Sequence, residues 1–182
     1  MRNLPVSTGM ACFVVACGLA TAPCARAATV RADVFVNGSS CQLSIPTTDT
    51  KARPKSTGFR NESTTTGNFV ICTALITPGN GTTDALDSLD IHIYSLDGTS
   101  RTVSCTAVSG WHGNGYRPPV YSTKAIPVAD TELGDGITWG PSDFGGVNGT
   151  IPGSFAISVT CNLPPQTAIN FLEPIFSYPV GS

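Results

Sequence analysis

Charged side chains are scarce in this sequence, and their scarcity argues against several kinds of partner. Of the 182 residues, 10 are Lys or Arg, 12 are Asp or Glu and only 2 are His. The cations form no basic run or stripe, so we expect no nucleic-acid partner, since such binding depends on neutralising phosphates. No polybasic segment is present that would hold an anionic membrane surface. After residue 28 no apolar run is long enough for a membrane helix, so we expect no membrane span.

The usual sequence motifs of catalysis and redox chemistry are also missing. There is no C-x-x-C pair and no G-x-S-x-G nucleophile elbow. Neither His92 nor His112 is near a cysteine in the sequence, and the glutamates Glu62, Glu132 and Glu173 are isolated. We therefore predict that the protein is not an enzyme and needs no cofactor. Two alternatives stay open: a Ser-His-Asp triad, because serines and aspartates are abundant, and a secreted hydrolase with two carboxylates across a cleft.

The densest acidic cluster consists of Asp84, Asp87 and Asp90, with Asn80 just before it. Oxygen-rich loops of this kind can hold Ca²⁺. The spacing does not fit an EF-hand loop, because the Gly at position 6 and the Glu at position 12 are missing. We expect solvated turn and capping residues here, and no metal site.

The N-terminal segment has the pattern of a secretory signal peptide. Arg2 supplies a positive charge, Met10–Leu19 is a short apolar stretch, and Ala25-Arg26-Ala27 offers small residues to a signal peptidase. We predict that residues 1–27 are removed by cleavage before Ala28, and that residues 28–182 form one domain in the periplasm or outside the cell. Lipidation at Cys17 and a buried N-terminal helix are the alternatives.

The seven cysteines divide between this leader and the rest of the chain. Cys12, Cys17 and Cys24 lie in the leader, and the mature chain keeps the even set Cys41, Cys72, Cys105 and Cys161. An even set in an exported chain indicates two disulfides. Four cysteines allow three pairings; strand positions and chain order favour Cys41–Cys72 and Cys105–Cys161. We expect paired inward cysteines on two strands to form a bridge inside the core or between sheets.

Alternation of apolar and polar residues predicts several β-strands. It is clear in 89–93, 102–107 and 155–161, where each second residue is apolar, as in a strand with one buried face. Residues 69–76 are apolar on both faces, which predicts a central strand covered on both sides. Residues 47–66, rich in Ser, Thr and cations, are expected to form a long exposed loop with one short strand. The C-terminal stretch 171–182, with two prolines, is a poor candidate for a strand.

Turn residues complete the prediction of the fold. Asn-Gly and Asp-Gly pairs occur throughout the mature chain, and Asp97-Gly98 is placed for a β-hairpin between two strands. Short strands with frequent turns predict an all-β protein, an antiparallel β-sandwich of immunoglobulin-like or jelly-roll type. We expect a bacterial source, so the N-x-S/T sequons are interpreted as turn residues; they begin at Asn37, Asn61, Asn80 and Asn148.

One Gly-rich segment combines side chains that are typical of binding loops. Trp111, His112, Tyr116 and Arg117 bring two aromatic rings, an imidazole and a guanidinium together within seven residues. Exposed aromatics on such loops contact sugar faces or partner proteins. We predict ligand binding here, with a carbohydrate or an envelope protein as the ligand. The alternative is that Trp111 and Tyr116 cap the core, and Trp139 is expected to be a core residue.

Short motifs spread over the mature chain resemble small uncharacterised exported proteins of Gram-negative bacteria. They are Gly38-Ser39-Ser40-Cys41, Val70-Ile71-Cys72, Val103-Ser104-Cys105-Thr106, and Val159 to Pro165. This resemblance implies a disulfide-bonded β-sandwich with no known activity.

Residues 28–41, ATVRADVFVNGSSC, also resemble the opening strand of pilin and spore-coat-type subunits, which leads to a first cysteine. Such subunits lack a strand and borrow one from a neighbour. We therefore expect a non-catalytic binding or envelope-surface module, with a donor-strand structural subunit as the alternative.

Overall fold

A computed structural model of the chain describes residues 28–45, 51–74, 85–110, 112, 118–147, 149–153 and 156–180. Residues 1–27 lie outside this set, so the leader and its cleavage stay a prediction. The described residues form strands and two short 3-10 helices: β1 Ala28–Asp33, β2 Val36–Asn37, η1 Gly38–Ser40, β3 Gln42–Leu43, β4 Ala52–Lys55, β5 Gly58–Asn61, β6 Asn68–Thr73, β7 Ala85–Ser95, β8 Arg101–Ser109, β9 Val120–Val128, β10 Asp135–Trp139, η2 Pro141–Phe144, β11 Ile157–Leu163 and β12 Thr167–Val180.

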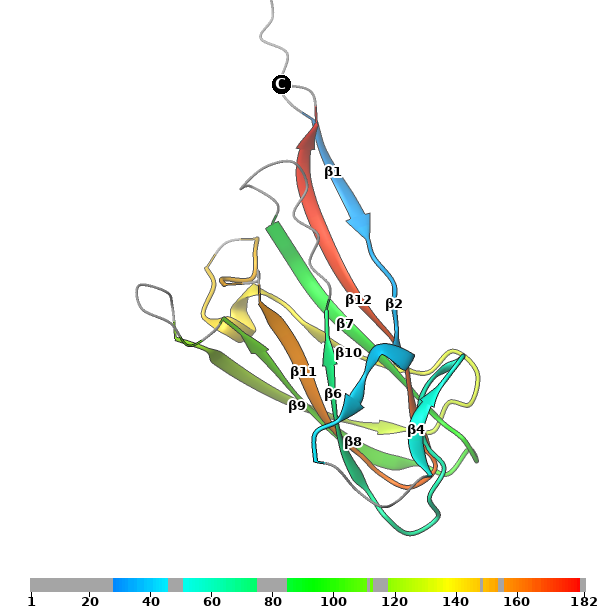
Figure 1. Cartoon of the computed structure of the whole chain (residues 1–182). Coiled ribbons are helices and arrows are strands. Elements are labelled where there is room, and N and C mark those ends of the chain that lie inside the picture. The colour runs from blue at the N-terminus through cyan, green and yellow to red at the C-terminus, as the bar shows by residue number, and fades with distance from the viewer. Residues whose placement is uncertain are drawn as a thin grey trace, which may run out of the picture.

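The strands make two antiparallel sheets that pack face to face (Figure 1). Sheet A has the order β10-β7-β12-β5-β4, and β1 and β2 also pair with β12. Sheet B has the order β3-β6-β11-β8-β9. Buried residues from both sheets form one apolar cluster between them. The predicted all-β antiparallel sandwich is therefore confirmed.

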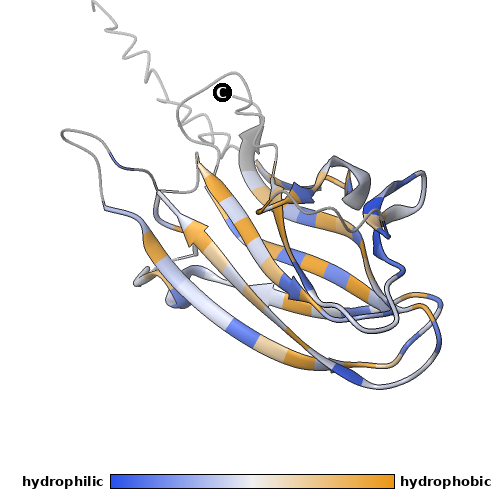
Figure 2. Cartoon of the chain, turned by 60° about the horizontal axis from the view of Figure 1, so that its bottom comes forward, coloured by the Kyte–Doolittle hydropathy of each residue, from blue (hydrophilic) through white to orange (hydrophobic). Residues whose placement is uncertain are grey.

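The alternating segments behave as predicted. In β7 the side chains of Leu89, Ile91 and Ile93 are fully buried, and each second residue is buried in β8 from Val103 onward and in β11 from Ile157 onward. Residue 155 of the predicted segment 155–161 lies outside the described residues. Figure 2 shows this alternation as bands of opposite hydropathy along the strands. Each such Leu or Ile stabilises the fold by about 1.5–3 kcal/mol relative to an exposed one. Trp139 is buried in the core, as predicted, and its Nε1 donates to the carbonyl of Ser122 on β9 at 3.1 Å.

The Asp97-Gly98 turn exists, but the predicted hairpin is wrong. The turn joins β7 of sheet A to β8 of sheet B, so the flanking strands lie in different layers. Asp97 accepts two hydrogen bonds from Arg101, at 2.6 and 2.8 Å, and one from the amide of Thr99 at 3.0 Å. These bonds hold the pKa of Asp97 well below its usual range. The turn itself was predicted correctly from its residues. The sheet that each flanking strand joins depends on tertiary packing, which the turn residues do not determine.

The expectation for the C-terminal stretch is also wrong, because β12 is the longest described strand. It pairs with β7 along one edge; along the other it pairs with β5, β2 and β1 in turn. Pairing with β2 ends at Leu172 and pairing with β1 begins at Ile175. Pro174 lies in this gap, where its carbonyl accepts from the amide of Val34 at 3.1 Å. The missing N–H of Pro174 therefore falls at a break in the ladder and costs no strand pairing.

Residues 47–66 are not a long exposed loop in their described part, from residue 51 onward. They contain the hairpin β4–β5, in which Ala52 and Phe59 are buried core residues. The sequon residue Asn61 is fully buried, and its Nδ2 donates to the carbonyls of Thr66 and Leu163 at 2.8 and 2.9 Å. Two polar residues of this segment, Asn61 and Ser63, are buried and fix a turn by hydrogen bonds, although most of the other polar residues here are exposed.

The strand within 69–76 is covered on one face only. β6 lies next to the edge strand β3 of sheet B, with Val70 and Cys72 buried. Phe69 is 52% exposed on the opposite face. The apolar outward residues of β6 therefore belong to a surface, and the prediction of two-sided burial is wrong.

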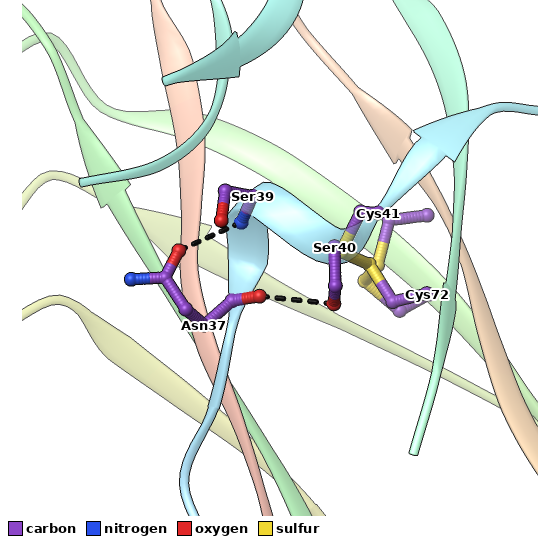
Figure 3. Close-up of a disulfide and its surroundings, with 7 residues drawn as sticks. Asn37, Ser39, Ser40, Cys41 and Cys72 are labelled. Atoms are coloured by element: carbon purple, nitrogen blue, oxygen red, sulfur yellow. Dashed lines mark hydrogen bonds between the residues drawn. A yellow bond between two sulfur atoms is a disulfide. The ribbon is translucent and has the colours of Figure 1, made fainter. Parts of the chain in front are cut away.

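Both predicted disulfides, Cys41–Cys72 and Cys105–Cys161, are present. Cys105 and Cys161 are directly opposite each other on β8 and β11, on the inner face of sheet B. Cys41 follows η1, whose start is capped by the Asn37 side chain accepting from the amide of Ser39 at 2.8 Å (Figure 3). Cys105–Cys161 joins the neighbouring strands β8 and β11, and Cys41–Cys72 joins the residue before β3 to the neighbouring strand β6. Both bridges therefore lie within sheet B, and neither joins the two sheets.

The two disulfides indicate a protein that folds outside the reducing cytoplasm. Within the described ranges, no helix has the length and apolar character needed to cross a membrane.

Candidate functional site

Most of the predicted aromatic loop lies outside the described residues. Trp111, Tyr116 and Arg117 are among those not described, and His112 is exposed. The predicted role of this loop in ligand binding therefore stays a prediction. In the chain this segment follows β8 and precedes β9, whose residues Ser109 and Val120 are directly opposite each other.

The outer face of sheet B carries no charged residue among those described. Cross-strand register places these side chains on it, opposite the buried cysteines and aliphatics: Gln42, Phe69, Ile71, Thr73, Thr102, Ser104, Thr106, Val108, Tyr121, Thr123, Ala125, Pro127, Ser158, Thr160 and Asn162. We call this set the sheet-B face. Protein surfaces ordinarily carry many Lys, Arg, Asp and Glu residues. A five-strand surface without them is suited to a partner that is itself uncharged.

Hydroxyl groups form a row across the middle of the sheet-B face. Thr160, Thr106 and Thr123 are directly opposite one another on β11, β8 and β9. On the β6 side the row of hydroxyls ends at the apolar Ile71, which is opposite Thr160. The Oγ1 atoms of Thr106 and Thr123 are 2.8 Å apart and hydrogen-bonded. Each hydroxyl can both donate and accept, which matches the hydroxyls of a sugar. None of these side chains carries a charge that would have to be desolvated on binding.

Two aromatic rings stand at opposite corners of the same face. Phe69 is 52% exposed on β6, and Tyr121 is 61% exposed on β9. Three strand spacings and four residues along the strands separate them, a distance of about 20 Å for ordinary sheet geometry. Aromatic rings at this separation, with hydroxyls between them, fit an extended ligand rather than a single sugar ring.

The outer face of sheet A brings together residues that are far apart in the sequence. The His92 ring on β7 stacks on Phe171 of β12, with centroids 4.3 Å apart. Phe171 in turn contacts Phe35 edge-on at 5.3 Å. His92 alternates with the buried Ile91 and Ile93 and so faces outward, as the alternation in 89–93 implies, but it is covered by an aromatic ring and does not point freely into solvent. The sequence did not predict that Phe35 or Phe171 would take part in such a cluster.

Two carboxylates lie beside this stack. Glu173 is directly opposite Asp90 in the β12–β7 register, and its Oε2 is 3.8 Å from Nε2 of His92. Glu173 is therefore not isolated, contrary to the sequence interpretation. One Asp90 oxygen is buried without a hydrogen-bond partner. In the part of the chain that the structure describes, no serine hydroxyl bonds to His92, so the elements of a nucleophilic triad are not assembled there.

The acidic cluster disperses in the fold. Asp87 accepts a hydrogen bond from the Ser177 hydroxyl, whereas Asp90 faces Glu173. Asn80 and Asp84 lie outside the described residues. No set of three His, Cys, Asp or Glu side chains within the described ranges is arranged to hold a metal ion.

Comparison with known proteins adds no functional information, since no protein-family model and no curated protein matches this chain.

Proposed function

We propose that this protein is an exported, non-catalytic binding module of the cell envelope or cell surface, and that its ligand is a neutral polysaccharide. The observation that carries the proposal is the sheet-B face, which combines hydroxyl rows with exposed rings and lacks charge among the described residues. Small molecules ordinarily bind in closed pockets, whereas an extended chain can lie across several strands of an open sheet. The 111–117 segment, with its two aromatics, connects β8 and β9 of the same sheet in the chain.

The disulfides support this role indirectly. Cys105–Cys161 and the Cys41–Cys72 bridge both lie under the sheet-B face, within the sheet that presents it. A rigid platform loses little conformational freedom when a ligand binds, so less of the binding energy is spent on ordering the protein.

Binding of the exported chain to neutral polysaccharides tests the proposal. Pull-down on insoluble cellulose, chitin and β-glucan, followed by calorimetry with soluble oligosaccharides, should identify a binder. The double variant F69A/Y121A should weaken that binding about fivefold or more, if each ring contributes as much as an aromatic ring does in a ring–ring pair, roughly 0.5–1.5 kcal/mol. The matched control F35A/H92A, which removes rings from sheet A, should bind as the unmodified protein does.

A second double variant separates the face from the loop. If W111A/Y116A abolishes binding while F69A/Y121A does not, the loop is the site and the sheet-B face is not. Failure to bind any neutral glycan would overturn the proposal. Circular dichroism of each variant confirms that the sandwich remains folded.

A donor-strand structural subunit is the second candidate, and β1 is the observation that favours it. β1 contributes no residue to the buried core and is exposed along almost its whole length. A strand held only by pairing with β12 can transfer to the same edge of a neighbour. This candidate predicts ladders of multimers that disappear when residues 29–36 are deleted.

A further inference from the structure

The outer edge of β1 is an unpaired sheet edge in the described structure. β1 pairs with β12 from Ala28 opposite Val180 to Asp33 opposite Ile175, and with no other described strand. Figure 1 shows it at the border of sheet A, with its second edge free of neighbouring strands. An edge strand of this kind presents a row of unpaired N–H and C=O groups.

Such edges are ordinarily protected against pairing with another chain. Charged side chains (lysine above all), proline, bulges and very short strands are the usual devices. β1, with the sequence ATVRAD, contains neither lysine nor proline, and its six-residue register with β12 has no bulge. Its charged residues are Arg31 and Asp33, which have opposite signs.

The spacing of these two charges is what selects a partner. Arg31 and Asp33 lie two residues apart, hence on the same face of β1, and Arg31 Nε is 3.3 Å from Asp33 Oδ1. Both are well exposed, with side-chain exposures of 65% and 44%. In an antiparallel pair of identical strands, a positive and a negative charge placed symmetrically about one residue face their opposites on the second strand.

We propose that the free edge of β1 pairs antiparallel with β1 of a second copy of this chain, with Ala32 opposite Ala32 of the second copy. In that register Arg31 faces Asp33 of the second copy, and the same pair recurs by symmetry. Val30 then faces Val34 of the second copy. A slip of two residues places Arg31 opposite Arg31 or Asp33 opposite Asp33, and a slip of one leaves both charges unpaired.

Phe35 supplies a second reason for a partner at this edge. It follows β1, lies on the same face as Arg31 and Asp33, and is 65% exposed. The proposed register sets Phe35 opposite Thr29 of the second copy, so the partner strand covers part of the ring. Because the two-fold contact uses the same edge on both copies, it closes on itself and gives a dimer rather than a chain.

A charge-reversal experiment tests the register directly. R31D and D33R are made as single variants of the exported chain, and sedimentation equilibrium measures the dimer dissociation constant over a concentration series. Each single variant places like charges opposite each other twice, so each dissociation constant should rise at least about tenfold. An equimolar mixture of R31D and D33R should form a heterodimer about as tight as the unmodified dimer, because every cross-copy pair is then of opposite sign.

The mixing step separates this contact from the pair within one chain. Loss of the intrachain Arg31–Asp33 pair affects both variants alone and cannot be repaired by mixing them. The melting temperature of each variant should stay near that of the unmodified protein, as expected for an exposed ion pair. A monomer at every concentration, a ladder instead of a dimer, or a mixture that stays monomeric would each overturn the proposal. F69A/Y121A, on the other sheet, should dimerise normally.

Discussion

Lys124 and Asp143 join the edges of the two sheets. Lys124 on β9 of sheet B donates through Nζ to the Asp143 carboxylate in η2 at 2.8 Å and to the carbonyl of Thr138 on β10 of sheet A at 2.6 Å. Asp143 also accepts from the amide of Gly140 at 2.8 Å. With the Trp139–Ser122 hydrogen bond, these contacts close one side of the sandwich.

The Asp143 carboxylate should make stability depend on pH below neutrality. Partial burial acts to raise the pKa of Asp143, but hydrogen bonds from Lys124 and Gly140 outweigh it and hold the pKa below its ordinary value of 3.8. The unfolded chain therefore binds more protons than the folded one as the pH falls. The contribution of this carboxylate is complete above the ordinary value and is lost as the pH drops through the lowered one.

We expect D143N to lower the free energy of unfolding by about 1–3 kcal/mol at neutral pH, because hydrogen bonds to a charged group are removed. Urea denaturation of both proteins from about pH 6 to about pH 2 should show this difference shrinking toward the acid end. A difference that stays constant over the whole range would contradict the assigned role of the carboxylate.

Removal of the Cys105–Cys161 bridge should be costly. It closes a separation of 56 residues, and the chain-entropy model gives about 4 kcal/mol for a loop of that size. C105A/C161A should lose about 2–5 kcal/mol in denaturant unfolding. C41A/C72A, which opens a separation of 31 residues, should lose slightly less on the same model. Peptide mapping without reductant must return these two pairs and no others.

Asn61 should be far more sensitive to substitution than an exposed asparagine of the same fold. Its Nδ2 donates to the carbonyls of Thr66, Leu163 and Pro164, and its Oδ1 accepts from the amide of Ser63 at 3.2 Å. N61A leaves these buried groups without partners and should cost about 2–4 kcal/mol. N162A, at an exposed position on β11, should stay within about 0.5 kcal/mol of the unmodified protein. Equal effects of the two variants would show that the Asn61 network is unimportant.

Gly58 should tolerate no side chain. Its φ is +127°, and a Cβ atom would collide with the backbone carbonyl of Ile169 on β12. G58A should therefore cost about 3 kcal/mol or more, through strain and displacement of β12. G98A is the matched control: its φ is +74°, but a Cβ there would meet only Thr131 Cγ2 at 3.6 Å. That variant should lose about 1 kcal/mol. Thermal unfolding of G58A and G98A measures both losses.

Local patterns in the sequence were sufficient for much of this fold. Alternation identified β7, β8 and β11, and inward cysteines on two of these strands gave the correct pairing. β12 was missed because proline in general disfavours a strand. Pro174 is tolerated because it lies in the gap between the pairing of β12 with β2 and its pairing with β1, and the sequence around Pro174 does not reveal that gap. The β4–β5 hairpin was missed because Asn61 and its polar neighbours are buried by hydrogen bonding, which sequence polarity does not reveal.

The surfaces were harder to predict than the strands. The sheet-B face consists of alternate residues from segments far apart in sequence, so its lack of charge becomes visible only when the register of β6, β11, β8 and β9 is known. The alternation predicted in 89–93 correctly puts His92 on the outward face of its strand. Its aromatic neighbour Phe171 lies 79 positions later, at a distance that no local pattern spans.

The position of the strand ends has a mechanical consequence. Ala28 and Val180 are directly opposite each other at the end of the β1–β12 ribbon. A force that pulls Ala28 and Val180 apart would open that ribbon one hydrogen-bonded pair at a time, because the load acts across the strands. Sheet B, which holds both disulfides, lies outside the path of that load. A tether attached at these two residues would therefore yield first at β1, while the sheet-B face kept its shape.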